Sequence, residues 1–186
     1  MKKLFLYIFL VLIISENANT GSVNRNIKLD KLFEQLKNSN KISLSLKIEM
    51  SIWNIWSTHP TQDKLTLLLA KGSDLMSIGK LESAHKVFST IILSDPNWAE
   101  GWNKRATVFY LMGRYQDSLN DIDEVLKREH RHFGALSGQG LVHIKLENYE
   151  KAIESYLAAK KIYPSIRAAE VMIPQLQELI KKDESI

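Results

Sequence analysis

The sequence has no cysteine among its 186 residues. This absence excludes disulfide frameworks, thiolate zinc sites, cysteine nucleophiles and lipid attachment through an N-terminal cysteine. Motifs for other chemistries are missing as well: there is no glycine-rich phosphate loop, no HExxH, no GxSxG and no paired acid–base arrangement. We therefore expect a protein with no catalytic residues, no metal and no cofactor.

The chain also lacks a dense stripe of one charge. Its 25 Lys and Arg residues outnumber 21 Asp and Glu residues, for a formal net charge of +4, but the basic residues are spread along the chain. Nucleic-acid-binding domains usually gather Lys and Arg on one surface, so this distribution argues against a nucleic-acid partner. Hydrophobic residues make up 45% and charged residues 25%, which is ordinary for a folded globular protein and argues against disorder.

A long hydrophobic run occurs at the N-terminus. Lys2 and Lys3 precede the apolar segment 4–14, and small and polar residues follow it over 15–22. This order is typical of an export signal. As a helix the apolar segment spans roughly 16 Å, about half of the ~30 Å hydrocarbon core of a bilayer. We therefore expect residues 1–20 to be an export signal; the alternative is a short membrane anchor, which would be the chain's one link to a membrane.

The rest of the chain repeats with a period of 34 residues. Three consecutive windows, 65–98, 99–132 and 133–166, carry the same kind of residue at equivalent positions without a gap. Two of the columns are small and one is bulky: Gly72, Ala106 and Gly140; Ala84, Ser118 and Ala152; Phe88, Ile122 and Tyr156. The period indicates a repeated supersecondary unit, and such units stack because none can bury its apolar face alone.

Each window is predicted to form two helices joined by a turn. The first helices span 65–78, 99–112 and 133–146, and the second helices span 82–93, 116–127 and 150–161. Apolar residues three, four and seven apart give each helix one buried stripe. Gly79 and Gly113 occupy the turn in two windows, where glycine tolerates the left-handed exit from a helix.

These residues resemble the tetratricopeptide repeat (TPR) family, whose motif reads W-x2-L-G-x2-Y, A-x3-F and P. The middle window matches at Trp102, Ala106, Phe109, Ser118 and Ile122, and the resemblance covers residues 65–166. It implies an all-α, right-handed TPR-type α-solenoid of helix–turn–helix repeats. It also implies a non-catalytic interaction module or scaffold whose concave groove receives a segment of another protein.

Further helices are predicted on both sides of the repeats. Residues 29–58 form a degenerate helical pair suited to capping the first repeat, with helices over 29–38 and 42–57. Residues 167–182 form a C-terminal capping helix. Pro174 predicts a kink or a break within it, because proline lacks the N–H of the helical hydrogen bond. The tail after this helix is expected to fray.

Three strings of sequence narrow the resemblance. Residues 52–56, 99–107 and 131–138 are similar to small exported TPR proteins of alphaproteobacteria, and the likeness covers nearly the whole chain. It implies a periplasmic location. The alternative is a protein anchored in the inner membrane and facing the periplasm.

The concave groove is the candidate binding site. Its predicted lining comes from the first helix of each repeat: Leu69, Ser73, Met76, Asn103, Thr107, Tyr110, Ser137, Leu141 and Ile144. This mixture suits an extended peptide or a partner helix, with Asn103 able to hydrogen-bond a main chain and Tyr110 offering a rigid amphipathic contact. Two alternatives stay open: these side chains pack against the flanking helices, or the protein is a structural subunit of a cell-envelope assembly that uses its terminal faces.

One ligand known for the family is not expected here. TPR domains that clamp the C-terminal carboxylate of a chaperone use Lys and Asn at set places in the groove. In this chain those places hold Leu69, Ser73, Gly134 and Gly138, and partial matches are limited to Asn103 and Lys104.

Other polar residues of the repeats are predicted to be structural. Lys71, Arg105 and Gln139 stand in a column that the family fills with leucine, and we expect their stems to pack while their heads reach water or a nearby acid. Asp121 is expected on a solvated helix face.

The histidines are also interpreted as structural. His130 and His132 lie in a basic stretch at a repeat junction, which disfavours a metal dication and favours a capping role. His143 lies on a buried stripe and is expected to be a hydrogen-bonded core residue.

Overall fold

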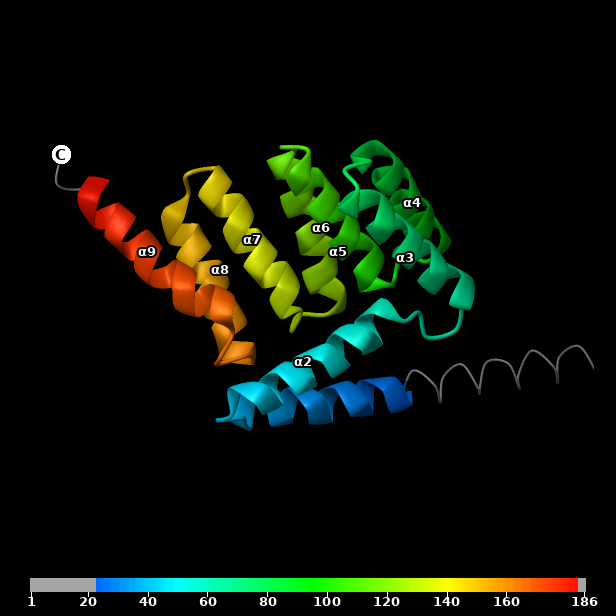
Figure 1. Cartoon of the computed structure of the whole chain (residues 1–186), viewed down its shortest axis with the longest axis horizontal. Helices are drawn as coiled ribbons and strands as arrows, with labels where there is room; N and C mark the ends of the chain where they lie inside the picture. Colours follow the sequence, from blue (N-terminus) through cyan, green and yellow to red (C-terminus); the bar gives the residue numbers. More distant parts are fainter. Residues whose placement is uncertain (1–22, 184–186) are drawn as a thin grey trace, which may run out of the picture.

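The computed structural model describes residues 23–183, and the regular structure within them is helical (Figure 1). The predicted export signal and the tail after residue 183 lie outside the described residues. Three antiparallel helix pairs stack in chain order: α3 (Asp63–Ser77) with α4 (Leu81–Ser94), α5 (Ala99–Leu111) with α6 (Tyr115–Arg128), and α7 (Phe133–Lys145) with α8 (Tyr149–Ile162). The predicted all-α solenoid of helix–turn–helix units is therefore confirmed.

The turns inside the three pairs share one hydrogen-bonded form. A residue with positive φ lies two positions after the end of each first helix: Gly79 (75°), Gly113 (73°) and Glu147 (58°). The next N–H then donates to the carbonyl five residues earlier, at 2.8–2.9 Å in all three turns. Glycine was predicted to allow this exit in two windows. Glu147 makes the same exit with a side chain, although the left-handed region disfavours one.

Close approach of the two helices depends on the small columns. Ser118 Oγ donates to the Ala106 carbonyl at 2.8 Å, so a second helix is bonded directly to the backbone of its first helix. At Gly140, an added Cβ would lie 2.7 Å from the ring of Tyr156, and Gly72 is covered by an aromatic ring in the same way. The crossing predicted from the small residues is present, and aromatic side chains fill the space that the glycines leave.

A separate pair of helices precedes the repeats: a helix over 23–38 and α2 (Ile42–Ser57), together called the N-terminal hairpin. Figure 1 shows α2 passing across the ends of α5 and α7. Apolar side chains of the hairpin share one core with the third repeat: Leu29, Phe33, Leu36, Ile48, Ile52, Trp56, Phe133 and Tyr163. The core of the first repeat contains no side chain of the hairpin, so the prediction that the hairpin caps the first repeat is wrong: its apolar face packs on the third repeat instead.

The last helix, α9 (Arg167–Asp183), covers the open side of α8. Ala169 and Leu176 are its buried contacts with the core. The helix continues through Pro174, so the break that the proline predicts does not occur. Among the described helices, none combines the length and the apolar character needed to cross a bilayer.

Candidate functional site

A small pocket opens between α5 and α7 on the face where the groove was predicted. Its volume is about 90 Å³, and we call it the α5–α7 pocket. Four of the predicted residues line it: Asn103, Thr107, Tyr110 and Leu141. Gly138 lies beside them, and an added Cβ there would meet one atom, Ile122 Cδ1, at 3.9 Å. The pocket therefore has an open wall of helix backbone.

The predicted residues of the first repeat lie elsewhere. Leu69 is buried in the core of that repeat, and Met76 packs against the same core. Ser73 Oγ donates to the Leu69 carbonyl at 2.9 Å. The expected site therefore does not extend evenly along all three repeats. Leu69 and Met76 pack within the core of their own repeat and not, as the first alternative expects, against the flanking helices.

A larger groove lies between α2, α7 and the start of α9. Its volume is about 610 Å³, and we call it the α2–α9 groove. Of the predicted residues it contains Ser137, whereas Ile144 packs against the nearby core. The sequence prediction missed its other walls, formed by Ile42 and Leu46 of α2, which are 73% and 50% exposed, and by Val171 of α9. The available signal was that α2 has more apolar positions than one buried stripe requires.

Trp53 lines the α2–α9 groove and lies against Gly134. Its ring would collide with a Cβ at Gly134, at 2.5 Å, so the absence of a side chain there is what admits the tryptophan. Trp53 also packs edge-on against Phe133, with 5.6 Å between ring centroids. The Lys104 ammonium lies 6.0 Å from the centroid of the Trp53 ring. Gly134 lines both cavities, so they adjoin at this point.

The two residues that partly match the carboxylate clamp, Asn103 and Lys104, both contact the carboxylate of Glu100. It is 1% exposed, and its carboxylate accepts from Asn103 Nδ2 at 3.2 Å and pairs with Lys104 Nζ at 3.4 Å. His132 Nδ1 accepts the N–H of Ala135 as the cap of α7, so Nε2 carries the proton and donates to Glu100 at 3.2 Å. Burial raises the pKa of Glu100, but the His132 hydrogen bond and the nearby positive charges outweigh it, and the pKa lies below its ordinary value.

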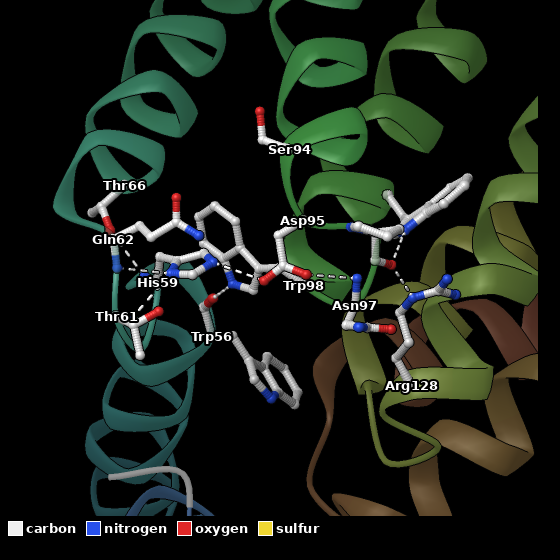
Figure 2. Close-up of polar contacts among 12 residues, drawn as sticks. Trp56, His59, Thr61, Gln62, Thr66, Ser94, Asp95, Asn97, Trp98 and Arg128 are labelled. Atoms are coloured by element: carbon white, nitrogen blue, oxygen red, sulfur yellow. Dashed lines mark hydrogen bonds and ion pairs between the residues drawn. The ribbon is translucent and has the colours of Figure 1, made fainter. Parts of the chain in front are cut away.

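A second histidine holds the segment between α2 and α3 (Figure 2). His59 Nδ1 accepts the N–H groups of Thr61 (3.2 Å) and Gln62 (3.0 Å), and Nε2 donates to Asp95 at 2.9 Å. Trp98 lies edge-on to the His59 ring and donates its Nε1–H to the Trp56 carbonyl at 2.9 Å. The end of α2 is therefore tied to the loop that joins the first and second repeats.

The polar column is bonded within the repeats. Arg105 makes a bidentate pair with Asp121 at 2.7 and 2.8 Å, and Gln139 Oε1 accepts from Ser155 Oγ at 3.1 Å. Both bonds span the same sequence separation, from a first helix to its own second helix. The interpretation that the heads reach a nearby acid is confirmed for Arg105. The solvated position expected for Asp121 is wrong, because this aspartate is 4% exposed beneath the guanidinium.

The remaining histidine predictions have different outcomes. His132 caps α7, as expected of a junction residue, whereas His130 is exposed. His143 is half-buried with no hydrogen-bond partner on Nδ1, so the expectation of a hydrogen-bonded core histidine is wrong. Burial and the charge of Lys151 lower the pKa of His143. Within residues 23–183, no three acidic or histidine side chains gather in a way that could hold a metal ion.

Comparison with known proteins agrees with this architecture. A family model described as tetratricopeptide repeat matches residues 103–165. A TPR repeat-containing protein of Rhizobium etli is 31% identical over 166 residues, which cover 89% of this chain and 80% of that protein.

Solved structures show the same fold at low identity. The first TPR domain of Spaghetti (RPAP3), bound to an HSP90 peptide, has a TM-score of 0.61 at 18% identity and covers 63% of this chain and 94% of its own. The Yersinia enterocolitica chaperone SycD, in complex with a peptide of the translocator YopD, has a TM-score of 0.60 at 16% identity, covering 67% and 97%. With the shared period and the Rhizobium relative, these findings show that the chain belongs to the tetratricopeptide repeat family.

Proposed function

We propose that this protein is a non-catalytic interaction module that binds a segment of a partner protein on its concave face. The α5–α7 pocket carries the proposal, because predicted groove residues from two repeats converge there on open helix backbone. Apolar walls with a few polar groups are typical of sites that hold one anchoring side chain. The solved TPR structures with peptides of HSP90 and YopD support this kind of function for the fold.

The proposed partner segment differs from a clamped chaperone terminus. Asn103 and Lys104 already contact the buried carboxylate of Glu100, and Trp53 fills the space at Gly134. A free carboxylate would meet Glu100 where the clamp resemblance needs positive charge. We therefore propose an internal segment with an apolar anchor, bound outside the cytoplasm if residues 1–20 act as an export signal.

The experiment places a photoreactive benzoylphenylalanine at Thr107, an exposed residue that lines the pocket. The control carries the same group at Leu93, which is 85% exposed on α4. Crosslinking in cells is expected to join a partner at Thr107 and not at Leu93. In a second arm, Gly138→Leu is designed to fill the pocket, since an added Cβ at this position meets one atom at 3.9 Å, and it is expected to abolish the Thr107 crosslink. Gly138→Ala is its matched control and is expected to leave the fold intact.

Folding is checked by circular dichroism on every variant, and both Gly138 variants are expected to melt no earlier than the wild type. The proposal fails if the same protein crosslinks from Thr107 and from Leu93. It also fails if Gly138→Leu folds normally and leaves the Thr107 crosslink unchanged, since the pocket would then be irrelevant to the contact.

A further inference from the structure

The α2–α9 groove contains a carboxylate that neutral groups hold in place. Glu49 Oε1 accepts from Trp53 Nε1 at 3.3 Å, and Glu49 Oε2 accepts from the Tyr163 hydroxyl at 3.1 Å. All three side chains line the groove. The two aromatic donors orient the carboxylate but add no positive charge, so its negative charge is left for something else to balance.

Glu49 differs in this respect from most other buried or half-buried carboxylates. Within residues 23–183, five of these others lie within 4.0 Å of a Lys or Arg side chain: Glu100 with Lys104, Asp117 with Arg114, Asp121 with Arg105, Glu124 with Arg128 and Glu129 with Arg131. Asp95 accepts from the neutral His59 ring, outside the groove. Among the same residues Glu49 is half-buried and has no such pair. A partly desolvated carboxylate gains most from a cation held close to it.

The opposite wall adds a second negative charge. Glu170 of α9 lines the groove, and its charge contributes, after burial and after Glu49, to raising the pKa of Tyr163. One cation, Arg167, also lines the groove, but it forms no ion pair with either glutamate within 4.0 Å. The polar part of the groove is therefore net negative.

The rest of the groove is suited to apolar side chains. Ile42 and Leu46 are largely exposed on one wall, and Val171 is 45% exposed on the other. A volume of about 610 Å³ falls within the range of pockets that bind ligands, roughly 300–1,000 Å³. Large exposed aliphatic side chains on both sides of a cavity favour a ligand that covers them.

We propose that the α2–α9 groove binds an apolar segment of a partner protein that sets one lysine or arginine against Glu49. This inference rests on the proposed function and names the chemistry of its partner: aliphatic side chains cover Ile42, Leu46 and Val171, and one basic side chain completes the ion pair that Glu49 lacks. The N-terminal hairpin is then a wall of the binding site and not only a cap of the solenoid.

The test selects random peptides from a phage library against the full-length chain. Selected peptides are expected to carry aliphatic residues around one enriched Lys or Arg. Glu49→Gln removes the charge and keeps one acceptor oxygen, for either Trp53 or Tyr163. It should weaken the binding of these peptides about tenfold or more, as expected for a lost charge-assisted hydrogen bond. Leu46→Asp should abolish binding, and Glu34→Gln, on an exposed face of the same hairpin, should change nothing.

The outcomes separate this inference from the proposed function. Peptides that Gly138→Leu blocks but Glu49→Gln and Leu46→Asp leave unaffected would overturn the inference and keep the function. Peptides enriched in acidic residues, or insensitive to all of these variants, would overturn the inference too, and insensitivity to all would count against both.

Two other occupants of the groove are also detectable. Dimerisation of the purified chain that Leu46→Asp abolishes, measured by sedimentation, would show that a second copy fills the groove. Crosslinks from benzoylphenylalanine at Leu46 to other residues of the same chain would show that the groove is filled from within. Either result would overturn the proposal.

Discussion

The N-terminal hairpin and the repeats are held by different kinds of contact. In the repeats the same contacts return every 34 residues: a left-handed turn, a small residue at the crossing and an aromatic or aliphatic side chain over it. The hairpin uses contacts that occur once. Trp56 stacks on His132 at 4.0 Å, Arg131 pairs with Asp30 at 2.6 Å, and Tyr163 donates to Glu49. Periodic packing orders the solenoid, whereas individual long-range pairs position the hairpin.

The largest effect is expected where those single contacts concentrate. Trp56 is 4% exposed, stacks on His132 and lies close to Phe33, Trp53 and Phe133. Trp56→Ala should lower the free energy of unfolding by about 3–5 kcal/mol, the range for removing a large buried aromatic side chain. Urea denaturation measures this loss. Hydrogen exchange should show amides of residues 23–57 losing protection before those of α3 and α4.

Met50→Ala is the control for this change, because Met50 is 71% exposed on the same helix. It should alter the free energy of unfolding by less than about 0.5 kcal/mol. A uniform loss of protection over the whole chain in Trp56→Ala would contradict the distinction, since hairpin and repeats would then open as one unit.

The same distinction explains how much of the fold the sequence predicts. The three helix pairs follow from a period that repeats local information, and even Glu147 adopts the turn that Gly79 and Gly113 indicate. The helices of the hairpin are also predictable, because amphipathic spacing is local, but the first begins at residue 23 and not at the predicted residue 29. The position of the hairpin is not predictable, because nothing in one sequence relates Trp56 to a histidine 76 positions away.

The candidate site divides in the same way. Asn103, Thr107 and Tyr110 were predicted as groove residues because they occupy periodic positions on one helix, and they do line a pocket. Ile42 and Leu46 were missed as site residues, since they belong to a helix whose docking is not periodic. Asp121 was misplaced because its surroundings depend on the non-standard Arg105 in the preceding helix.

A smaller effect, confined to the repeats, separates two neighbouring glycines of α7. A Cβ at Gly140 would lie 2.7 Å from the ring of Tyr156, whereas at Gly138 the nearest atom is 3.9 Å away. Gly140→Ala should therefore cost about 1–3 kcal/mol by overpacking. Gly138→Ala should stabilise the protein by up to about 1 kcal/mol, because alanine is the better helix former.

Thermal and urea denaturation of the two variants check the sign of each change. The pair is its own control, since the substitution, the helix and the solvent are the same. If both variants were stabilised, the close approach of α7 and α8 would not limit packing, and the periodic half of the comparison would lose its physical basis.

The smallest effect compares two tyrosines, one in each kind of contact. Burial, together with the charge of Glu49, raises the pKa of Tyr163 to about 12. Burial, together with Tyr110, raises the pKa of Tyr156 to about 12 as well. The Tyr163 hydroxyl donates to Glu49 of the hairpin, whereas the Tyr156 hydroxyl has no hydrogen-bond partner. At neutral pH, Tyr163→Phe should therefore cost about 1 kcal/mol for a lost hydrogen bond, and Tyr156→Phe should cost less.

Alkaline pH should then reduce the stability of the wild type through both residues. The folded-state pKa is raised above the ordinary value of 10, so the folded chain keeps a proton that the unfolded chain loses. This contribution is complete below pH 10 and falls as pH rises toward 12. Urea denaturation across that interval should give each Phe variant a shallower decline than the wild type, but Tyr163→Phe alone should start from a lower stability. Equal stabilities at neutral pH would mean that the hydroxyl of Tyr163 does not help to position the hairpin, which would then depend on its aromatic contacts and the Arg131–Asp30 pair.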